Sequence, residues 1–195
     1  MRYDWNSGGY DYLQAFGMSP KNASIAGYMV SLIKKPCNIL DAACGLCPIV
    51  PFLPENLISR YVAFDNSDYV EECLRYKERE FFEFRRLSFD QFFCDTSYKR
   101  DSFDFVLYLG MYGGYDIYAE RLEKLLPYAK SDGYIILEAI DEHIEDVLSI
   151  MNKKHSNYSE IASCNIQVYD DKLSHLTRER FRSIHVYQAL MLEIE

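Results

Sequence analysis

Short apolar segments alternate with helix-like segments along most of this chain, and this alternation limits its fold more than any other feature. Strand-like segments are found at residues 38–41, 61–65, 82–87, 102–109 and 134–138. The spacing of apolar residues, together with capping residues, predicts helices over about 19–35, 49–59, 67–80 and 116–129. Apolar strands that alternate with helices of this length form a parallel sheet covered by helices on both faces.

The last third of the chain has a different pattern. A helix is expected near residues 141–154, and residues 160–169 and 181–194 both look extended, with the polar stretch Asp170 to Arg180 between them. Two late strands without a long crossover helix predict an antiparallel end to the sheet. A turn is expected at residues 131–133, before the fifth strand.

The whole pattern predicts an α/β three-layer sandwich, Rossmann-like, with a seven-stranded and mostly parallel sheet and an antiparallel C-terminal strand. We interpret residues 1–195 as one domain, since its length is typical of a single domain. Residues 1–36 would form an N-terminal cap, residues 37–140 the core, and residues 141–195 a helix and a strand pair.

Composition excludes several classes of function. The formal net charge is −9, from 21 Lys and Arg against 30 Asp and Glu, which argues against a nucleic-acid partner. No apolar run is long enough to cross a membrane, and the first residues contain no apolar export signal, so we expect a cytoplasmic protein. The six cysteines are expected to be free thiols. Only Cys44 and Cys47 are close in sequence, so we expect no metal site.

Chemistry-bearing residues gather at the ends of the expected strands, where an open parallel sheet binds its ligands. The first strand ends in Asp41 and a run of small residues, the second in Asp65, and the fourth in Tyr108 and Leu109. Small residues let the backbone approach a ligand, and a carboxylate after the second strand can accept hydrogen bonds from both ribose hydroxyls. After the third strand, Phe89 can wall an adenine ring and Asp90 can accept from its amino group. The strand ends therefore suit a nucleoside ligand.

From about residue 38 to residue 138, the chain resembles the class I S-adenosylmethionine-dependent methyltransferases. The family pattern after the first strand is acid-x-Gly-x-Gly-x-Gly, and here the segment reads Asp41-Ala42-Ala43-Cys44-Gly45-Leu46-Cys47. Gly45 keeps the middle glycine, while Ala43 and Cys47 replace the other two. Each replacement adds a Cβ, so we expect a positive φ and close backbone approach to be harder there.

The resemblance implies S-adenosylmethionine as cofactor, S-adenosylhomocysteine as product, and methyl transfer to an oxygen or nitrogen nucleophile of a small molecule or peptide. Direct transfer of this kind relies mainly on positioning. The resemblance and the positions of the strand ends together indicate the residues that bind the cofactor. They are Asp41, Ala42, Ala43, Cys44, Gly45, Asp65, Asn66, Phe89, Asp90, Tyr108 and Leu109.

Acceptor-side residues are expected after strands four and five and at the N-terminus. Tyr112, beside two glycines, is a candidate for substrate contact and catalysis, and His143 is a candidate base at the pocket rim. Tyr3, Trp5 and Tyr10 could form an aromatic lid, or simply pack against the sheet. So small a cap leaves the site open, and a second subunit in a homodimer could complete it.

Two other functions remain open at this point. The loss of two glycines is compatible with a catalytically inert or partner-dependent binding domain of the methyltransferase type. The segment Cys44-Gly45-Leu46-Cys47 also resembles the turn of a dithiol oxidoreductase. That class has a proline facing its thiols, and no proline lies between Pro54 and Pro127. The dithiol reading also leaves Asp65 unexplained.

Overall fold

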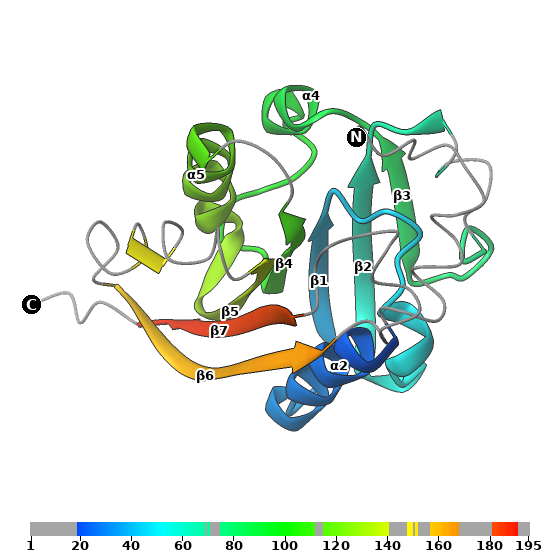
Figure 1. Cartoon of the computed structure of the whole chain (residues 1–195). Coiled ribbons are helices and arrows are strands. Elements are labelled where there is room, and N and C mark those ends of the chain that lie inside the picture. The colour runs from blue at the N-terminus through cyan, green and yellow to red at the C-terminus, as the bar shows by residue number, and fades with distance from the viewer. Residues whose placement is uncertain are drawn as a thin grey trace, which may run out of the picture.

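A seven-stranded sheet in the order β3-β2-β1-β4-β5-β7-β6 forms the centre of the molecule (Figure 1). The computed structural model describes residues 19–68, 70, 75–111, 115–140, 148–149, 151, 157–167 and 181–190. The strands are β1 (Cys37–Ala42), β2 (Ile58–Asp65), β3 (Phe82–Arg86), β4 (Phe103–Met111), β5 (Ala129–Ile140), β6 (Tyr158–Gln167) and β7 (Phe181–Ala189). The first five pair in parallel, and β7 runs antiparallel to both β5 and β6. The expected fold class is confirmed.

Helices cover both faces of this sheet. The α-helices are α2 (Ser19–Leu32), α4 (Phe89–Cys94) and α5 (Tyr115–Leu125), and the short 3-10 helices are η2 (Val50–Phe52), η3 (Glu55–Leu57) and η4 (Leu126–Tyr128). Residues of α2 and η2 pack on one face, and residues of α4, α5 and η4 pack on the other. Figure 1 shows this separation, with α2 away from α4 and α5.

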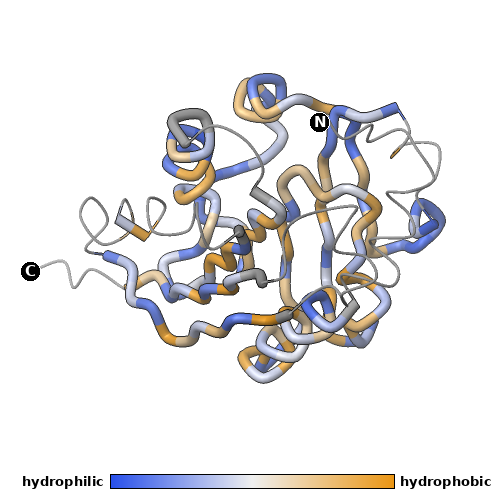
Figure 2. Tube along the Cα trace, in the orientation of Figure 1, coloured by the Kyte–Doolittle hydropathy of each residue, from blue (hydrophilic) through white to orange (hydrophobic). Residues whose placement is uncertain are grey.

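The core is divided by the sheet into two layers because neighbouring strand residues point to opposite faces. In β1, Ile39 packs with the α2 layer and Leu40 packs with the α4 and α5 layer, and both are fully buried. The strands in the middle of the sheet carry hydrophobic residues on both faces, since β1 and β4 each contribute to both core layers. This is typical of a parallel sheet buried on both sides. Figure 2 shows hydrophobic stretches along these strands.

Two of the helix predictions are wrong in extent. Residues 49–59 form no α-helix, because Pro51 and Pro54 lack the N–H that a continuous helix needs, and the chain folds into η2 and η3 instead. The helix expected over residues 67–80 does not reach its predicted end, since residues 75–78 form a turn.

The segment before the fifth strand also differs from expectation. The helix expected over 116–129 ends at Leu125, and Pro127 lies in the 3-10 turn that follows. The turn expected at 131–133 lies inside β5, where the pairing with β4 shifts register. A Cβ at Gly133 would lie 3.0 Å from the backbone nitrogen of Lys130, so this irregular stretch favours glycine.

Helix α4 is absent from the sequence-based expectation, which placed only a strand end there. Ser88 accepts a hydrogen bond from the backbone N–H of Gln91, and the Gln91 side chain accepts one from the backbone N–H of Ser88. This reciprocal capping box was readable in the sequence as Ser-x-x-Gln.

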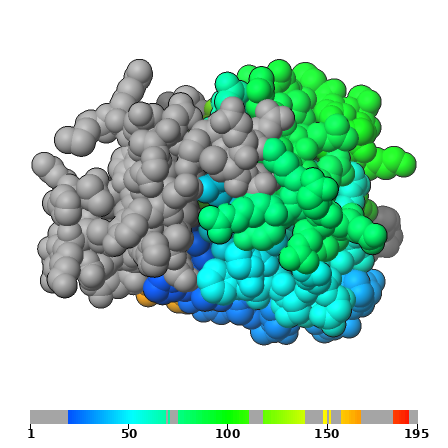
Figure 3. Space-filling model, turned by 90° about the vertical axis from the view of Figure 1, so that its right-hand side faces the viewer, coloured from blue at the N-terminus to red at the C-terminus, as the bar shows by residue number. Residues whose placement is uncertain are grey.

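The β3 edge of the sheet carries charged side chains. Glu83 pairs with Arg60 and Arg85, and Arg86 pairs with Asp68. Figure 3 shows the molecule from this side, where the segments coloured cyan to green form the surface. Such charges discourage another strand from adding to an edge. Among the described residues, no helix combines the length and apolar character that crossing a membrane requires.

Candidate functional site

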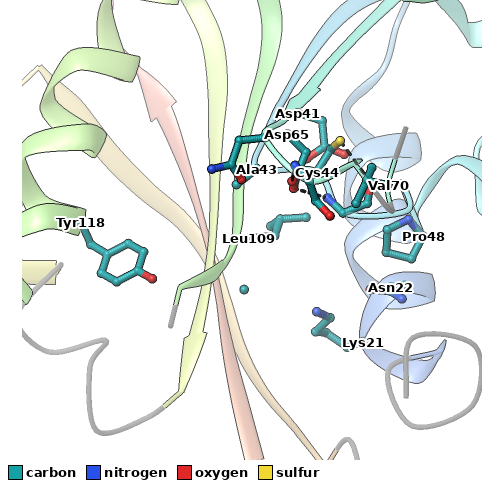
Figure 4. A pocket seen from close by; sticks show the side chains of 14 residues that line it. Lys21, Asn22, Asp41, Ala43, Cys44, Pro48, Asp65, Val70, Leu109 and Tyr118 are labelled. Carbon is teal, nitrogen blue, oxygen red and sulfur yellow. Dashed lines mark hydrogen bonds between the residues drawn. The ribbon is translucent and has the colours of Figure 1, made fainter. Parts of the chain in front are cut away.

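A cavity of about 340 Å³ opens at the carboxyl ends of β1, β2 and β4, where α2 and α5 approach from either side (Figure 4). The residues that line it are Lys21, Asn22, Asp41, Ala43, Cys44, Gly45, Pro48, Asp65, Asn66, Ser67, Val70, Leu109, Gly110 and Tyr118. Its place is the one expected for a ligand site in an open parallel sheet.

Asp65, the last residue of β2, is held in place by backbone N–H groups. Its Oδ2 accepts a hydrogen bond from Gly45 N at 3.1 Å, and its Oδ1 accepts one from Ser67 N at 3.0 Å. Burial raises the pKa of Asp65, and these backbone hydrogen bonds oppose the rise because they favour the charged form. The result is a fixed carboxylate at the cavity wall.

Asp41, near the end of β1, lies deeper and is 2% exposed. Tyr61 of β2 donates its hydroxyl to Asp41 Oδ2 at 2.6 Å. Burial raises the pKa of Asp41 to about 7, and the Tyr61 hydrogen bond and the positive charge of Lys21 oppose that rise. The charge of Asp41 therefore changes near neutral pH.

We expect this carboxyl to make the folded protein less stable as the pH rises towards 7. Because the pKa of Asp41 is about 7 in the fold and about 4 in an unfolded chain, the folded state holds an extra proton between these values. The free energy of unfolding then falls by at most about 1.4 kcal/mol per pH unit and levels off above pH 7. Urea denaturation from pH 5 to 8 measures this. In Asp41→Asn, the free energy of unfolding should fall less steeply with pH. An unchanged pH dependence in that variant would contradict the raised pKa of Asp41.

The loop after β1 keeps left-handed backbone at each position of the glycine pattern. The φ angles are 54° at Ala43, 51° at Gly45 and 51° at Cys47. The Cβ atoms of Ala43 and Cys47 do not prevent the positive φ, because hydrogen bonds and burial hold the loop in this conformation. Cys44 N donates to Phe64 O at 3.1 Å, Cys47 N donates to Cys44 O at 3.0 Å, and the Cys47 side chain is fully buried. Residues other than glycine adopt this conformation at a cost of roughly 1–2 kcal/mol each.

Ala43→Gly is therefore expected to stabilise the protein by about 0.5–1 kcal/mol, since relief of the strained φ exceeds the entropy cost of glycine. Ala43 is exposed, so the change removes no core contact. The matched control is Ala42→Gly, in β1 and fully buried, which should destabilise by about 1 kcal/mol. Thermal melting of both variants tests this, and destabilisation by Ala43→Gly would show that the strain is absent.

A buried ion pair closes the other end of the cavity. Lys21 Nζ of α2 lies 3.1 Å from Glu138 Oε2 of β5, and these side chains are 5% and 0% exposed. The same Oε2 accepts a hydrogen bond from Gly110 N at 2.7 Å. Gly110 has a φ of 67° and lies where the pairing of β4 with β5 shifts register. Glu138 therefore connects α2 to the end of β4.

Comparisons with solved structures place this fold among known proteins. The plantazolicin methyltransferase BpumL in complex with S-adenosylhomocysteine has a TM-score of 0.61 and 15% identity, with 89% of this chain and 84% of that chain covered. The Burkholderia thailandensis 1,6-didemethyltoxoflavin-N1-methyltransferase, also with S-adenosylhomocysteine bound, has a TM-score of 0.66 and 14% identity over 93% and 82%. A Haloferax volcanii putative methyltransferase in complex with the Trm112 activator has a TM-score of 0.64 and 14% identity over 97% and 99%.

The fold is that of the class I S-adenosylmethionine-dependent methyltransferases. No protein-family model matches the sequence, and no curated protein matches it. Identities of this size show the fold alone, so the role of each residue in this methyltransferase fold stays a prediction.

The cavity brings together seven of the cofactor-binding residues predicted from the sequence: Asp41, Ala43, Cys44, Gly45, Asp65, Asn66 and Leu109. The other four lie outside its lining. Ala42, Phe89 and Tyr108 are buried in the core, where the Phe89 ring lies 5.6 Å from the Tyr108 ring, and Asp90 is exposed in the first turn of α4. Tyr3, Trp5, Tyr10, Tyr112 and His143 lie outside the described residues.

Several cavity residues were not predicted: Lys21, Asn22, Pro48, Ser67, Val70, Gly110 and Tyr118. For two of them the sequence carried a signal. Lys21 and Asn22 each precede an apolar residue of α2 by four positions, Ile25 and Ala26, so they share the buried face of the helix. Polar residues on such a face point to a site that the helix covers.

The two cysteines of the loop are buried rather than poised for thiol chemistry. Burial raises the pKa of Cys44 well above its usual range and also raises the pKa of Cys47. Cys44 Sγ donates to Gly45 O at 3.3 Å. A nucleophilic thiolate needs a lowered pKa and access to solvent, and neither thiol meets these conditions.

Iodoacetamide at pH 8 is therefore expected to alkylate the exposed Cys94 in the native protein and to leave Cys44 and Cys47 unmodified until the chain is unfolded. Peptide mass mapping after timed alkylation measures this, and Cys94 serves as the internal control. Native-state alkylation of Cys44 or Cys47 at the rate of Cys94 would revive the dithiol function.

Proposed function

We propose that this protein is an S-adenosylmethionine-dependent methyltransferase that acts on an oxygen or nitrogen nucleophile of a small molecule. The observation that carries the proposal is the fixed carboxylate of Asp65 at the end of β2, on the wall of a cavity in a methyltransferase fold. A carboxylate in this place suits a ribose diol, because both of its oxygens can accept hydrogen bonds from hydroxyl groups.

The chemistry of the cavity walls fits this cofactor. When bound, the cofactor supplies a methyl group on a positively charged sulfur. Asp65, together with Asp41 when it is ionised, gives the cavity a negative side that favours a cation. Val70 and Leu109 provide apolar wall for a base, and Gly45 allows the backbone to approach. The residues of the chain bind the cofactor and the acceptor and orient them toward each other. This positioning supplies much of the rate of a direct displacement.

The acceptor is expected at the β4 side of the cavity, near Gly110 and Tyr118. The net charge of −9 supports a small molecule over nucleic acid. Tyr112 and His143 remain candidates for contact with this acceptor, and a lid of Tyr3, Trp5 and Tyr10 and a homodimer remain part of the proposal.

A partner-dependent domain is the second candidate. The Haloferax volcanii protein, which shares this fold over nearly its whole length, is in complex with an activator. The strained positions Ala43 and Cys47 give a reason why this loop could need support from a second protein.

Calorimetric titration of the purified chain with S-adenosylmethionine and S-adenosylhomocysteine tests the proposal. Micromolar binding by the chain alone supports the methyltransferase and makes a screen of acceptors worthwhile. A folded chain that binds neither compound would contradict an independent enzyme and favour the partner-dependent domain.

A further inference from the structure

Two consecutive residues of α2, Lys21 and Asn22, form an unusual polar end to the cavity. They are 4% and 1% exposed, both line the cavity, and neither is part of the strand-end chemistry described above. Figure 4 shows both side chains on α2, at the opposite end of the cavity from Asp41 and Asp65. A ligand that reaches from Asp65 across the cavity therefore ends at this pair.

The side-chain amide oxygen of Asn22 is a buried hydrogen-bond acceptor without a donor. Among the described residues, Asn22 Oδ1 is buried and no donor reaches it. A buried acceptor without a partner costs roughly 1–3 kcal/mol, and native proteins leave few of them. Because Asn22 lines the cavity, a small rotation of its side chain brings this oxygen within reach of a donor that arrives with a ligand.

Lys21 brings a positive charge to the same place. It is the one cationic side chain among the described residues that line the cavity. Glu138 holds the ammonium at 3.1 Å, which keeps the charge at the wall rather than in solvent. A cation fixed beside a cavity suits a carboxylate, because hydrogen bonds between charged groups are the stronger ones.

The loop after β1 offers a ligand less accessible backbone than a loop with all three glycines of the family pattern would. Ala43 presents a Cβ at the cavity wall, and Cys47 turns its side chain into the core. Side chains of α2 are well placed to supply the recognition that bare glycine backbone would otherwise give.

We infer that Lys21 and Asn22 form a subsite for the zwitterionic end of an α-amino acid. Lys21 binds its carboxylate and Asn22 Oδ1 accepts from its ammonium group. The assignment rests on the proposed function, because the amino-acid end of the cofactor is the first source of this group. A methyl acceptor that is itself an amino acid is the second source, because it has the same carboxylate and ammonium groups.

Two ligands that differ only at this end separate the possibilities. S-adenosylhomocysteine carries the amino-acid group, and 5′-methylthioadenosine lacks it. Calorimetry with both compounds is run on the full-length wild type, on Asn22→Leu and on the double variant Lys21→Met/Glu138→Gln, which removes both buried charges together. Lys34→Met is the matched control, since Lys34 is exposed just beyond the end of α2.

Asn22→Leu and the double variant are expected to weaken S-adenosylhomocysteine at least about 10-fold and to leave 5′-methylthioadenosine unchanged, which places the cofactor end at the subsite. Asn22→Leu should also raise the melting temperature, since it removes an unpartnered polar atom. A purely structural role of Asn22 would instead lower it.

If the amino-acid group belongs to a methyl acceptor, the wild type binds both nucleosides with equal affinity. Its complex with 5′-methylthioadenosine then also binds L-methionine, and this binding is lost when Lys21 or Asn22 is replaced. Equal weakening of both nucleosides, or no change in any variant, overturns the subsite while leaving the methyltransferase standing. A folded wild type that binds neither nucleoside overturns the proposed function and this assignment with it.

Discussion

Replacing Asp65 with asparagine is expected to weaken the binding of S-adenosylhomocysteine by about 100-fold. Each hydrogen bond to a charged group contributes roughly 1.5 kcal/mol or more, and the carboxylate has an oxygen for each ribose hydroxyl. Asparagine has the same shape but only one acceptor oxygen, so the variant removes charge and one acceptor without opening a cavity. Calorimetric titration of the wild type and Asp65→Asn measures the change.

The control for this prediction is Asp132→Asn, which changes an exposed carboxylate near the start of β5, away from the carboxyl ends of the strands. It should bind as the wild type does. Thermal melting shows whether Asp65→Asn stays folded, because Asp65 also accepts from Gly45 N and Ser67 N. A folded Asp65→Asn protein with wild-type affinity would show that Asp65 does not hold the ribose.

Lys21→Met is expected to lower the free energy of unfolding by about 3–5 kcal/mol. The change leaves Glu138, which is fully buried, without its cation, and an unpaired charge in the interior is strongly destabilising. Urea denaturation near pH 7 measures the effect.

The double variant Lys21→Met/Glu138→Gln should regain most of this loss, since no buried charge remains and the glutamine oxygen can still accept from Gly110 N. Together with the single variant Glu138→Gln, these two variants and the wild type form a complete cycle that isolates the coupling between the side chains. A loss below about 1 kcal/mol in Lys21→Met would mean that the pair is far more hydrated than its burial indicates.

Much of the sheet was predictable because its strands are buried on both faces and read as apolar runs. Segments whose structure depends on single prolines or on capping side chains were not predicted. Pro51 and Pro54 replaced a helix with 3-10 turns, and the reciprocal bonds of Ser88 and Gln91 made a helix where none was expected. In each case a short-range rule outweighed the average pattern of the surrounding residues.

The strand-end half of the cavity was predicted from the sequence, and the helix half was not, although the polar residues on the buried face of α2 were a signal for it. Asp65 and Gly45 were identifiable because a parallel sheet brings strand ends together at one edge. Lys21 and Asn22 enter the cavity only because α2 docks against the sheet with that face inward, which no strand pattern reveals. The placement of Asp90 outside the cavity follows in the same way from α4, whose first turn exposes it.

The contact between Lys21 and Glu138 joins residues that are 117 positions apart in the sequence. Closing a contact between segments so far apart costs conformational entropy, because the intervening chain loses much of its freedom. The contact exists only when both α2 and β5 are packed in place. The cavity wall at this end is therefore complete only when two distant parts of the chain have folded together, so a ligand that binds there reports on both.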